Sequence, residues 1–156
     1  QQAYAKLWAA ENIYTPEFVL NGKEWQNWLS FRGAPEASPS TPGTLQVSST
    51  DGRHWVAKFS PTESGRHDYE ITAAVLVSDL STDVKSGENA GRHLRHDFAA
   101  LSLITRPFAS QTNRLEASFI IDNNPKGFTG RLALAVWVTR AGQLEPLQAT
   151  GGWLPK

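Results

Sequence analysis

An alternation of apolar and polar residues with a period of two dominates the chain from about residue 44 onward. It is clearest over residues 69–78 (YEITAAVLVS), where alternate side chains would point to opposite faces of an extended strand. Turn sequences separate the apolar stretches, and no long helical period lies between them. The pattern predicts strands near 44–49, 54–60, 68–78, 94–105, 114–122, 131–140 and 145–150. We therefore expect a mainly β fold, an antiparallel β-sandwich of about seven strands.

A different organisation is expected near the start of the chain. The stretch QQAYAKLWAAEN (1–12) has the spacing of a short amphipathic helix. After it, Asn21-Gly22 joins two short apolar stretches and fits a type I′ turn, which predicts a β-hairpin. One or two helical turns are expected at 26–31. A run rich in Pro, Gly and Ser follows at 32–43, so we divide the chain into an N-terminal part at 1–33, a linker at 34–43 and a sandwich domain at 44–156.

Composition excludes several kinds of chemistry. Lys plus Arg and Asp plus Glu number 15 each, so no overall charge favours a nucleic-acid partner. The chain contains no cysteine and therefore forms no disulfide, thiolate metal site or cysteine nucleophile. Apolar runs end well before the roughly 20 residues that span a bilayer, so no membrane span is predicted. No serine elbow, phosphate loop or zinc-protease helix is visible, and we predict no catalytic residue, metal site or cofactor.

Two stretches carry the candidate binding residues. Thr15-Pro16 comes directly before an apolar stretch. Thioredoxin and glutaredoxin folds have a cis-proline at such a position, and an extended peptide binds beside it. The alternative is an ordinary trans proline. The second stretch, 83–98, concentrates charge around a tight turn, and its alternative interpretation is a hairpin loop whose Arg and Glu pair with each other. Two of its histidines are three residues apart, which argues against a shared metal ion on a strand. The candidates here are Ser86, Gly87, Glu88, Asn89, Gly91, Arg92, His93, Arg95 and His96.

Both stretches, in this order, resemble a bacterial family of exported thioredoxin-like proteins, domain of unknown function 1223. QQAYAKLWAAENIYTPEFVLNG resembles the latter part of its thioredoxin-like domain, and SGENAGRHLRHDF resembles its most recognisable downstream stretch. The resemblance implies that 1–33 is the C-terminal helix-hairpin remnant of a thioredoxin-like fold, that Pro16 is cis, and that the protein is periplasmic or secreted. The Cys-x-x-Cys segment of the family would lie upstream of Gln1, so the resemblance transfers no catalytic residue. A sequence without methionine is also expected to be a segment of a longer translated chain.

Two functions remain open. The chain is either the non-catalytic C-terminal part of an extracytoplasmic thioredoxin-like protein that performs thiol–disulfide exchange when intact, or a binding or scaffolding module. Such a module would recognise a protein or an anionic ligand through the 86–97 loop. The expected partner is a protein or the missing N-terminal segment, with a second copy of the chain as an alternative. We further expect the 87–97 loop to lie at a buried junction with the N-terminal part near Thr15-Pro16, where Arg92 and Arg95 donate to free main-chain carbonyls.

Overall fold

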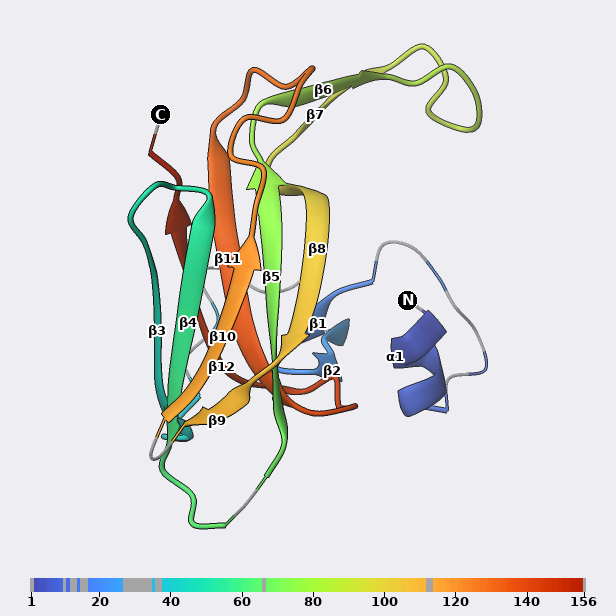
Figure 1. Cartoon of the computed structure of the whole chain (residues 1–156). Helices are drawn as coiled ribbons and strands as arrows, with labels where there is room; N and C mark the ends of the chain where they lie inside the picture. The colour runs from blue at the N-terminus through green and yellow to red at the C-terminus, as the bar shows by residue number, and fades with distance from the viewer. Residues whose placement is uncertain are drawn as a thin grey trace.

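Two antiparallel four-stranded sheets face each other and form the body of the molecule (Figure 1). The computed structural model describes residues 2–9, 11, 14, 17–26, 35, 38–65, 67–111 and 114–155. The first sheet has the order β3-β4-β10-β9, formed by Gly43–Ser49, His54–Pro61, Arg114–Ile120 and Ala109–Gln111 respectively. The second has the order β12-β11-β5-β8, formed by Pro146–Trp153, Leu132–Arg140, Tyr69–Val77 and Ala99–Pro107. The prediction of a mainly β, antiparallel fold is confirmed.

The core lies between these sheets and is built from the apolar positions of the alternating pattern. On β11, Leu134, Val136 and Val138 are buried, and their register places them opposite Val75, Ala73 and Ile71 of β5. Burial of this apolar face is the main contribution that the alternating pattern makes to stability. In β5 and β11 the opposite face is also partly buried, at Thr72, Ala74, Ala133 and Thr139. The largest fully buried side chains come from both sheets: Phe59, Ile71, Ile121, Val75, Val77, Val136 and Val138.

One strand passes from the second sheet to the first. Strand β8 pairs with β5, and after Pro107 and Phe108 the chain continues as β9, which pairs with β10. Proline has no amide hydrogen to donate, so it suits the point where one ladder ends. Phe108 is anchored there because its N–H donates to the Tyr69 carbonyl at 3.0 Å and its ring lies 6.2 Å from that of Phe59. At the other side of the sandwich, Gln148 Nε2 donates to the Gly43 carbonyl at 3.0 Å.

A two-stranded antiparallel ribbon extends the second sheet. It consists of β6 (Leu80–Asp83), β7 (His93–His96) and the loop between them, and we call residues 80–96 the ribbon. The prediction of one strand over 94–105 is wrong, because the chain bends at Asp97-Phe98 and β7 and β8 belong to different sheets. Phe98 has a φ of +56°, which is rare for a bulky residue and interrupts the extended backbone. The alternating apolar pattern does not predict such an interruption.

The N-terminal part contains the short helix α1 (Gln2–Leu7) and the hairpin of β1 (Val19–Leu20) and β2 (Lys23–Glu24), as predicted. Asn21 and Gly22 have φ angles of +51° and +76°, as a type I′ turn requires. Trp8 Nε1 donates to the Gly22 carbonyl at 3.2 Å, which ties the residues after α1 to this hairpin. The expected helical turns at 26–31 lie outside the described residues except for Gln26. Within the 34–43 linker, residues 34, 36 and 37 lie outside them, and 38–42 carry no helix or strand.

Candidate functional site

The ribbon stands clear of the sandwich. In Figure 1 it projects beyond the end of the two sheets, and its loop is far from their core. The register runs from Leu80 opposite His96 to Asp83 opposite His93. Main-chain hydrogen bonds then close the loop, since Val84 N–H donates to the Arg92 carbonyl at 2.9 Å and Gly91 N–H donates to the Val84 carbonyl at 2.8 Å. The ribbon is therefore an ordered hairpin, although its loop contributes no buried side chain to the core.

The base of the ribbon is a sharp bend in both strands. Ser78-Asp79 on one strand and Asp97-Phe98 on the other separate the β5–β8 ladder from the β6–β7 ladder. Asp79 and Phe98 both have positive φ angles, of 60° and 56°, which are unfavourable for residues other than glycine. An Asp97 carboxylate oxygen accepts from the Asp79 N–H at 3.1 Å, and the Asp79 carboxylate accepts from Arg95 Nη2 at 2.6 Å. These hydrogen bonds hold the bend in place.

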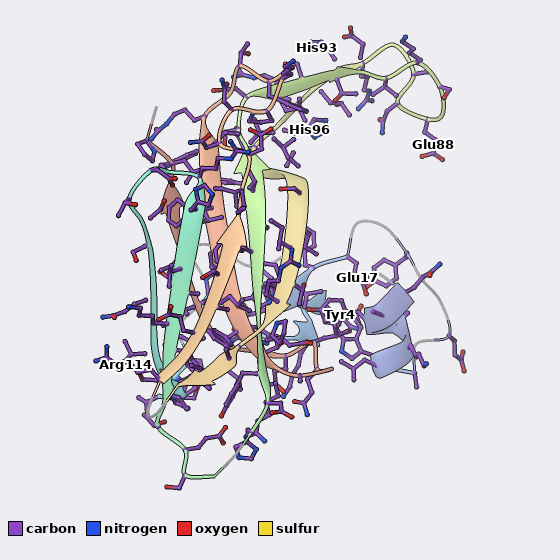
Figure 2. The ribbon with its side chains drawn as sticks, in the orientation of Figure 1. Tyr4, Glu17, Glu88, His93, His96 and Arg114 are labelled. Carbon is purple, nitrogen blue, oxygen red and sulfur yellow. The ribbon has the colours of Figure 1, made fainter. Side chains whose placement is uncertain are left out.

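The ribbon brings together the candidates from the second predicted stretch. Figure 2 shows Glu88 at the loop tip and His93 and His96 nearer the sandwich. Thr15 and Pro16 lie outside the described residues, so the first stretch is not placed and the cis-proline stays a prediction. The exposed candidates are Ser86, Gly87, Glu88, Asn89, Gly91, Arg92, His93 and Arg95, whereas His96 is half-buried.

The two faces of the ribbon differ in character. His93 Nδ1 lies 2.7 Å from an Asp83 carboxylate oxygen on an exposed, charged face that also carries Arg95. His96 lies on the opposite face with the half-buried Leu80 and Leu94. The two histidines thus diverge, as their spacing predicts, and the ribbon presents one charged and one more apolar surface.

The expectation of a buried junction at the 87–97 loop is wrong. The Arg92 side chain is exposed, and its main-chain N–H and carbonyl both bond within the loop, to Asn89 and Val84. Arg95 is also exposed and donates to Asp79 instead of to a sheet edge. The physical reason is that the ribbon extends the sheet past its end, so its charged groups are hydrated and need no burial to be satisfied.

A second polar feature lies at the turn between β3 and β4. This turn, Trp55, Asn123-Asn124 and Pro155 line an open hollow of about 990 Å³. Asp51 accepts from the His54 ring at 2.6 Å and from the N–H groups of His54 and Arg53 at 2.7 and 2.8 Å. These bonds, that from the His54 side chain first, hold the pKa of Asp51 below its usual range. Both carboxylate oxygens of Asp51 accept hydrogen bonds from within the turn. We therefore interpret Asp51 as a residue that stabilises this loop, and not as a ligand-binding group of the hollow.

The residues that the structure describes also bear on metal binding and on membrane spanning. No group of three or more His, Asp or Glu side chains there is placed to hold a metal ion. No helix within that part of the chain is long and apolar enough to cross a membrane.

Comparison with known proteins places the ribbon within a sequence family. The family described as "Protein of unknown function (DUF1223)" matches residues 1–139. This chain belongs to the DUF1223 family. The matched region includes α1, the β1–β2 hairpin, the ribbon and β11 up to Thr139, whereas β12 lies beyond it. No curated protein and no solved structure matches the chain.

Sequence reasoning missed one exposed cluster of the DUF1223 chain. Phe98, Arg131 and Trp153 lie together where the ribbon meets the second sheet, and we call them the aromatic corner. Phe98 is 55% exposed and Trp153 is 44% exposed. No sequence spacing links these residues. Pairing of β11 with β12 brings Arg131 near Trp153, whereas Phe98 reaches Trp153 from the bend before β8, which is at the other edge of the sheet. The sequence did contain one indication of this cluster, an aromatic residue that follows two glycines at the end of a strand, Gly151-Gly152-Trp153.

Proposed function

We propose that this DUF1223 chain is the non-catalytic, partner-binding part of an exported bacterial thioredoxin-like protein, and that the ribbon contacts the partner. The observation that carries the proposal is the exposed, hydrogen-bonded ribbon. Ordering a hairpin costs conformational entropy, and its loop returns no buried apolar area to the sandwich. Loops of this kind on a rigid scaffold commonly carry binding residues.

The charges on the ribbon favour a protein partner over a simple anion. Arg95 is already paired with Asp79, and His93 lies against Asp83. Lys85, Glu88 and Arg92 have no ion-pair partner among the described residues, so the exposed tip offers charges of both signs. A mixed polar surface of this type complements another protein and gives little attraction to a free anion.

The thioredoxin-like part of the proposal rests on the sequence resemblance of residues 1–22 and on the order of the N-terminal elements. In it, residues 1–33 are the C-terminal remnant of the thioredoxin-like domain, 34–43 is the linker, and 44–156 is the sandwich in an extracytoplasmic protein. The helix and the type I′ hairpin are compatible with that assignment. Thiol–disulfide exchange would use cysteines outside the chain, because none occurs within it.

Site-specific photocrosslinking tests the role of the ribbon. A photoreactive p-benzoylphenylalanine replaces Glu88 at the ribbon tip or, as the control, the exposed Arg114 at the opposite end of the sandwich (Figure 2). Irradiation in the bacterium that produces the protein should give a discrete adduct with a second protein from position 88 and none from position 114. The adduct should disappear when the photoreactive residue stays at position 88 and the other residues of 85–91 carry the sequence of an unrelated polar loop. No adduct from position 88, or the same adduct from both positions, contradicts the proposal.

Two observations test the thioredoxin-like assignment. The chain itself should not reduce insulin disulfides, because it holds no thiolate. The codons upstream of Gln1 are expected to encode a signal peptide and a Cys-x-x-Cys segment. An upstream region without cysteine would rule out thiol–disulfide exchange and leave the binding role alone.

A further inference from the structure

The aromatic corner is an exposed but well-defined arrangement of side chains. The rings of Phe98 and Trp153 are 5.3 Å apart between centroids and tilted by 33°. The Arg131 guanidinium carbon lies 4.1 Å from the centre of the Trp153 ring, in a cation–π contact. Trp153 is opposite Ala133 in the β11–β12 register, so a small neighbour leaves the indole ring standing above the sheet.

The backbone at Phe98 adds a second, independent observation. A bulky residue with a φ of +56° is under strain, yet this side chain is 55% exposed. The strain therefore secures little burial. The strained backbone instead fixes the position of the Phe98 ring. The bend is held by the hydrogen bond from the Asp79 N–H to Asp97, and at this bend the Phe98 ring contacts Trp153. Strain that holds an exposed side chain in one position is characteristic of a binding site.

The charge at the corner is not neutralised. No carboxylate among the described residues lies within ion-pair distance of Arg131. The two acidic side chains at the bend are already bonded, since Asp79 pairs with Arg95 and Asp97 accepts from a main-chain N–H. A guanidinium held over a ring by its central carbon still has N–H donors that can bind a planar anion in a bidentate manner.

Space for a ligand lies directly beside these groups. An open hollow of about 550 Å³ is lined by Arg131, Trp153, Leu154 and Pro155. One wall is thus cationic and the others are apolar. A ligand that satisfies both must carry a single negative charge next to an apolar group, because one arginine in apolar surroundings compensates poorly for the dehydration of a phosphate dianion.

We propose that the aromatic corner binds a carboxylate attached to an apolar side chain, as in the C-terminal residue of a peptide or a small organic acid. The carboxylate lies on the edge of Arg131, and the apolar group packs on Trp153, Leu154 and Pro155, which line the hollow. Phe98 supports the Trp153 ring. This site is separate from the ribbon tip, and it does not depend on the function proposed for the ribbon.

Isothermal titration calorimetry of the full chain with N-acetyl-phenylalanine tests the site. Binding is expected for the acid and should weaken at least about tenfold for the matched amide, which lacks the charge. Arg131→Gln should cause a similar loss, whereas Arg131→Lys, which keeps the charge without the planar fork, should cause a smaller one. The control Arg114→Gln removes an exposed arginine at the far end of the sandwich and should bind as the unaltered chain does.

Circular dichroism should show that each variant remains folded. The acid form of acetyl-Ala-Ala-Phe separates the two ligand sources, since tighter binding than N-acetyl-phenylalanine identifies a peptide terminus and equal binding identifies a small acid. Equal affinity for acid and amide, unchanged affinity in Arg131→Gln, or no binding of the acid at about 10 mM would each overturn the proposal. Replacing the tip residues 85–91 should leave binding of the acid at the aromatic corner intact. Failure of the ribbon hypothesis can therefore be told apart from failure of this proposal.

Discussion

Glu63 connects three parts of the chain at the end of the sandwich opposite the ribbon. One carboxylate oxygen accepts from the Tyr69 hydroxyl at the start of β5, and the other accepts from Arg140 Nη2 at the end of β11, at 2.6 Å. The hydrogen bond from Tyr69 lowers the pKa of Glu63, opposed by partial burial and assisted by the charges of Arg140 and His67. Burial and the bond to Glu63 raise the pKa of Tyr69 to about 12.

These shifts predict how Glu63→Gln changes stability with pH. A carboxyl whose folded pKa is depressed contributes stability above its unfolded pKa of about 4.3, and that contribution is lost as the pH falls through the folded value. The melting temperature of Glu63→Gln should therefore lie below that of the unaltered chain at pH 7, and the gap should narrow toward pH 3. Differential scanning calorimetry across this range measures the gap. Glu88→Gln at the exposed loop tip is the control and should melt as the unaltered chain does; a gap that widens in acid would contradict the assignment.

Gly130 is required where the loop before β11 passes the end of β5. A Cβ at this position would lie 1.6 Å from the Ser78 carbonyl oxygen, and main-chain atoms cannot yield as a flexible side chain would. We expect Gly130→Ala to reduce the free energy of unfolding by about 1–3 kcal/mol, the usual cost of overpacking. Gly152→Ala is the matched control, because a Cβ there meets nothing within 4 Å. Urea unfolding measures both, and equal midpoints for the two variants would contradict this account.

The ribbon is an element that the sandwich does not need for its stability. Its loop residues are exposed, and its ion pairs are on the surface, where each contributes about 0–1 kcal/mol. Replacing 85–91 with Asn-Gly should leave the melting temperature almost unchanged and the β-rich circular dichroism spectrum intact. A loss of cooperative melting would show that the ribbon takes part in the core.

Several strands could be predicted from the sequence because burying one face imposes a period of two. That period is clear in the residues of β5 and β11, and the Asn21-Gly22 turn is equally direct. The bend at Asp97-Phe98 could not be predicted in this way, since it depends on a hydrogen bond to Asp79 from the neighbouring strand. The candidate residues on the ribbon were recognisable as a polar turn, but their exposure depends on that bend. The aromatic corner depends on the pairing of β11 with β12 and on the bend at Phe98, and no local pattern contains either.

At the scale of the whole molecule, the sandwich is expected to fold without the N-terminal part. The link between them includes the Tyr4 hydroxyl bonded to the Leu144 carbonyl at 3.4 Å and the close approach of Gly22 to Glu145. The chain shortened to 40–156 keeps the bond from the Thr62 hydroxyl to the Thr41 carbonyl at 2.6 Å and the entire core. It should lose only on the order of 1–3 kcal/mol of unfolding free energy, because among the described residues the core cluster and the side chains packed against it begin at Leu45.

Circular dichroism and thermal melting test this expectation. The shortened chain should show a β-rich spectrum and one cooperative transition at a slightly lower temperature than the full chain. A gradual, uncooperative melt or a largely unfolded spectrum would show that residues 1–39 form part of one folding unit with the sandwich.

The passage of β8 into β9 determines how the molecule would bear a mechanical load. A partner that pulls on the ribbon pulls on β5 and β8 together, because the ribbon continues both strands beyond the bend. The tension would reach β11 through its ladder with β5, and it would reach the other sheet along the covalent chain from Pro107 through Phe108 to β9. Rows of hydrogen bonds loaded along the strands must shear at the same time, whereas bonds loaded one by one unzip. A pulling force on the ribbon is therefore resisted by both sheets together.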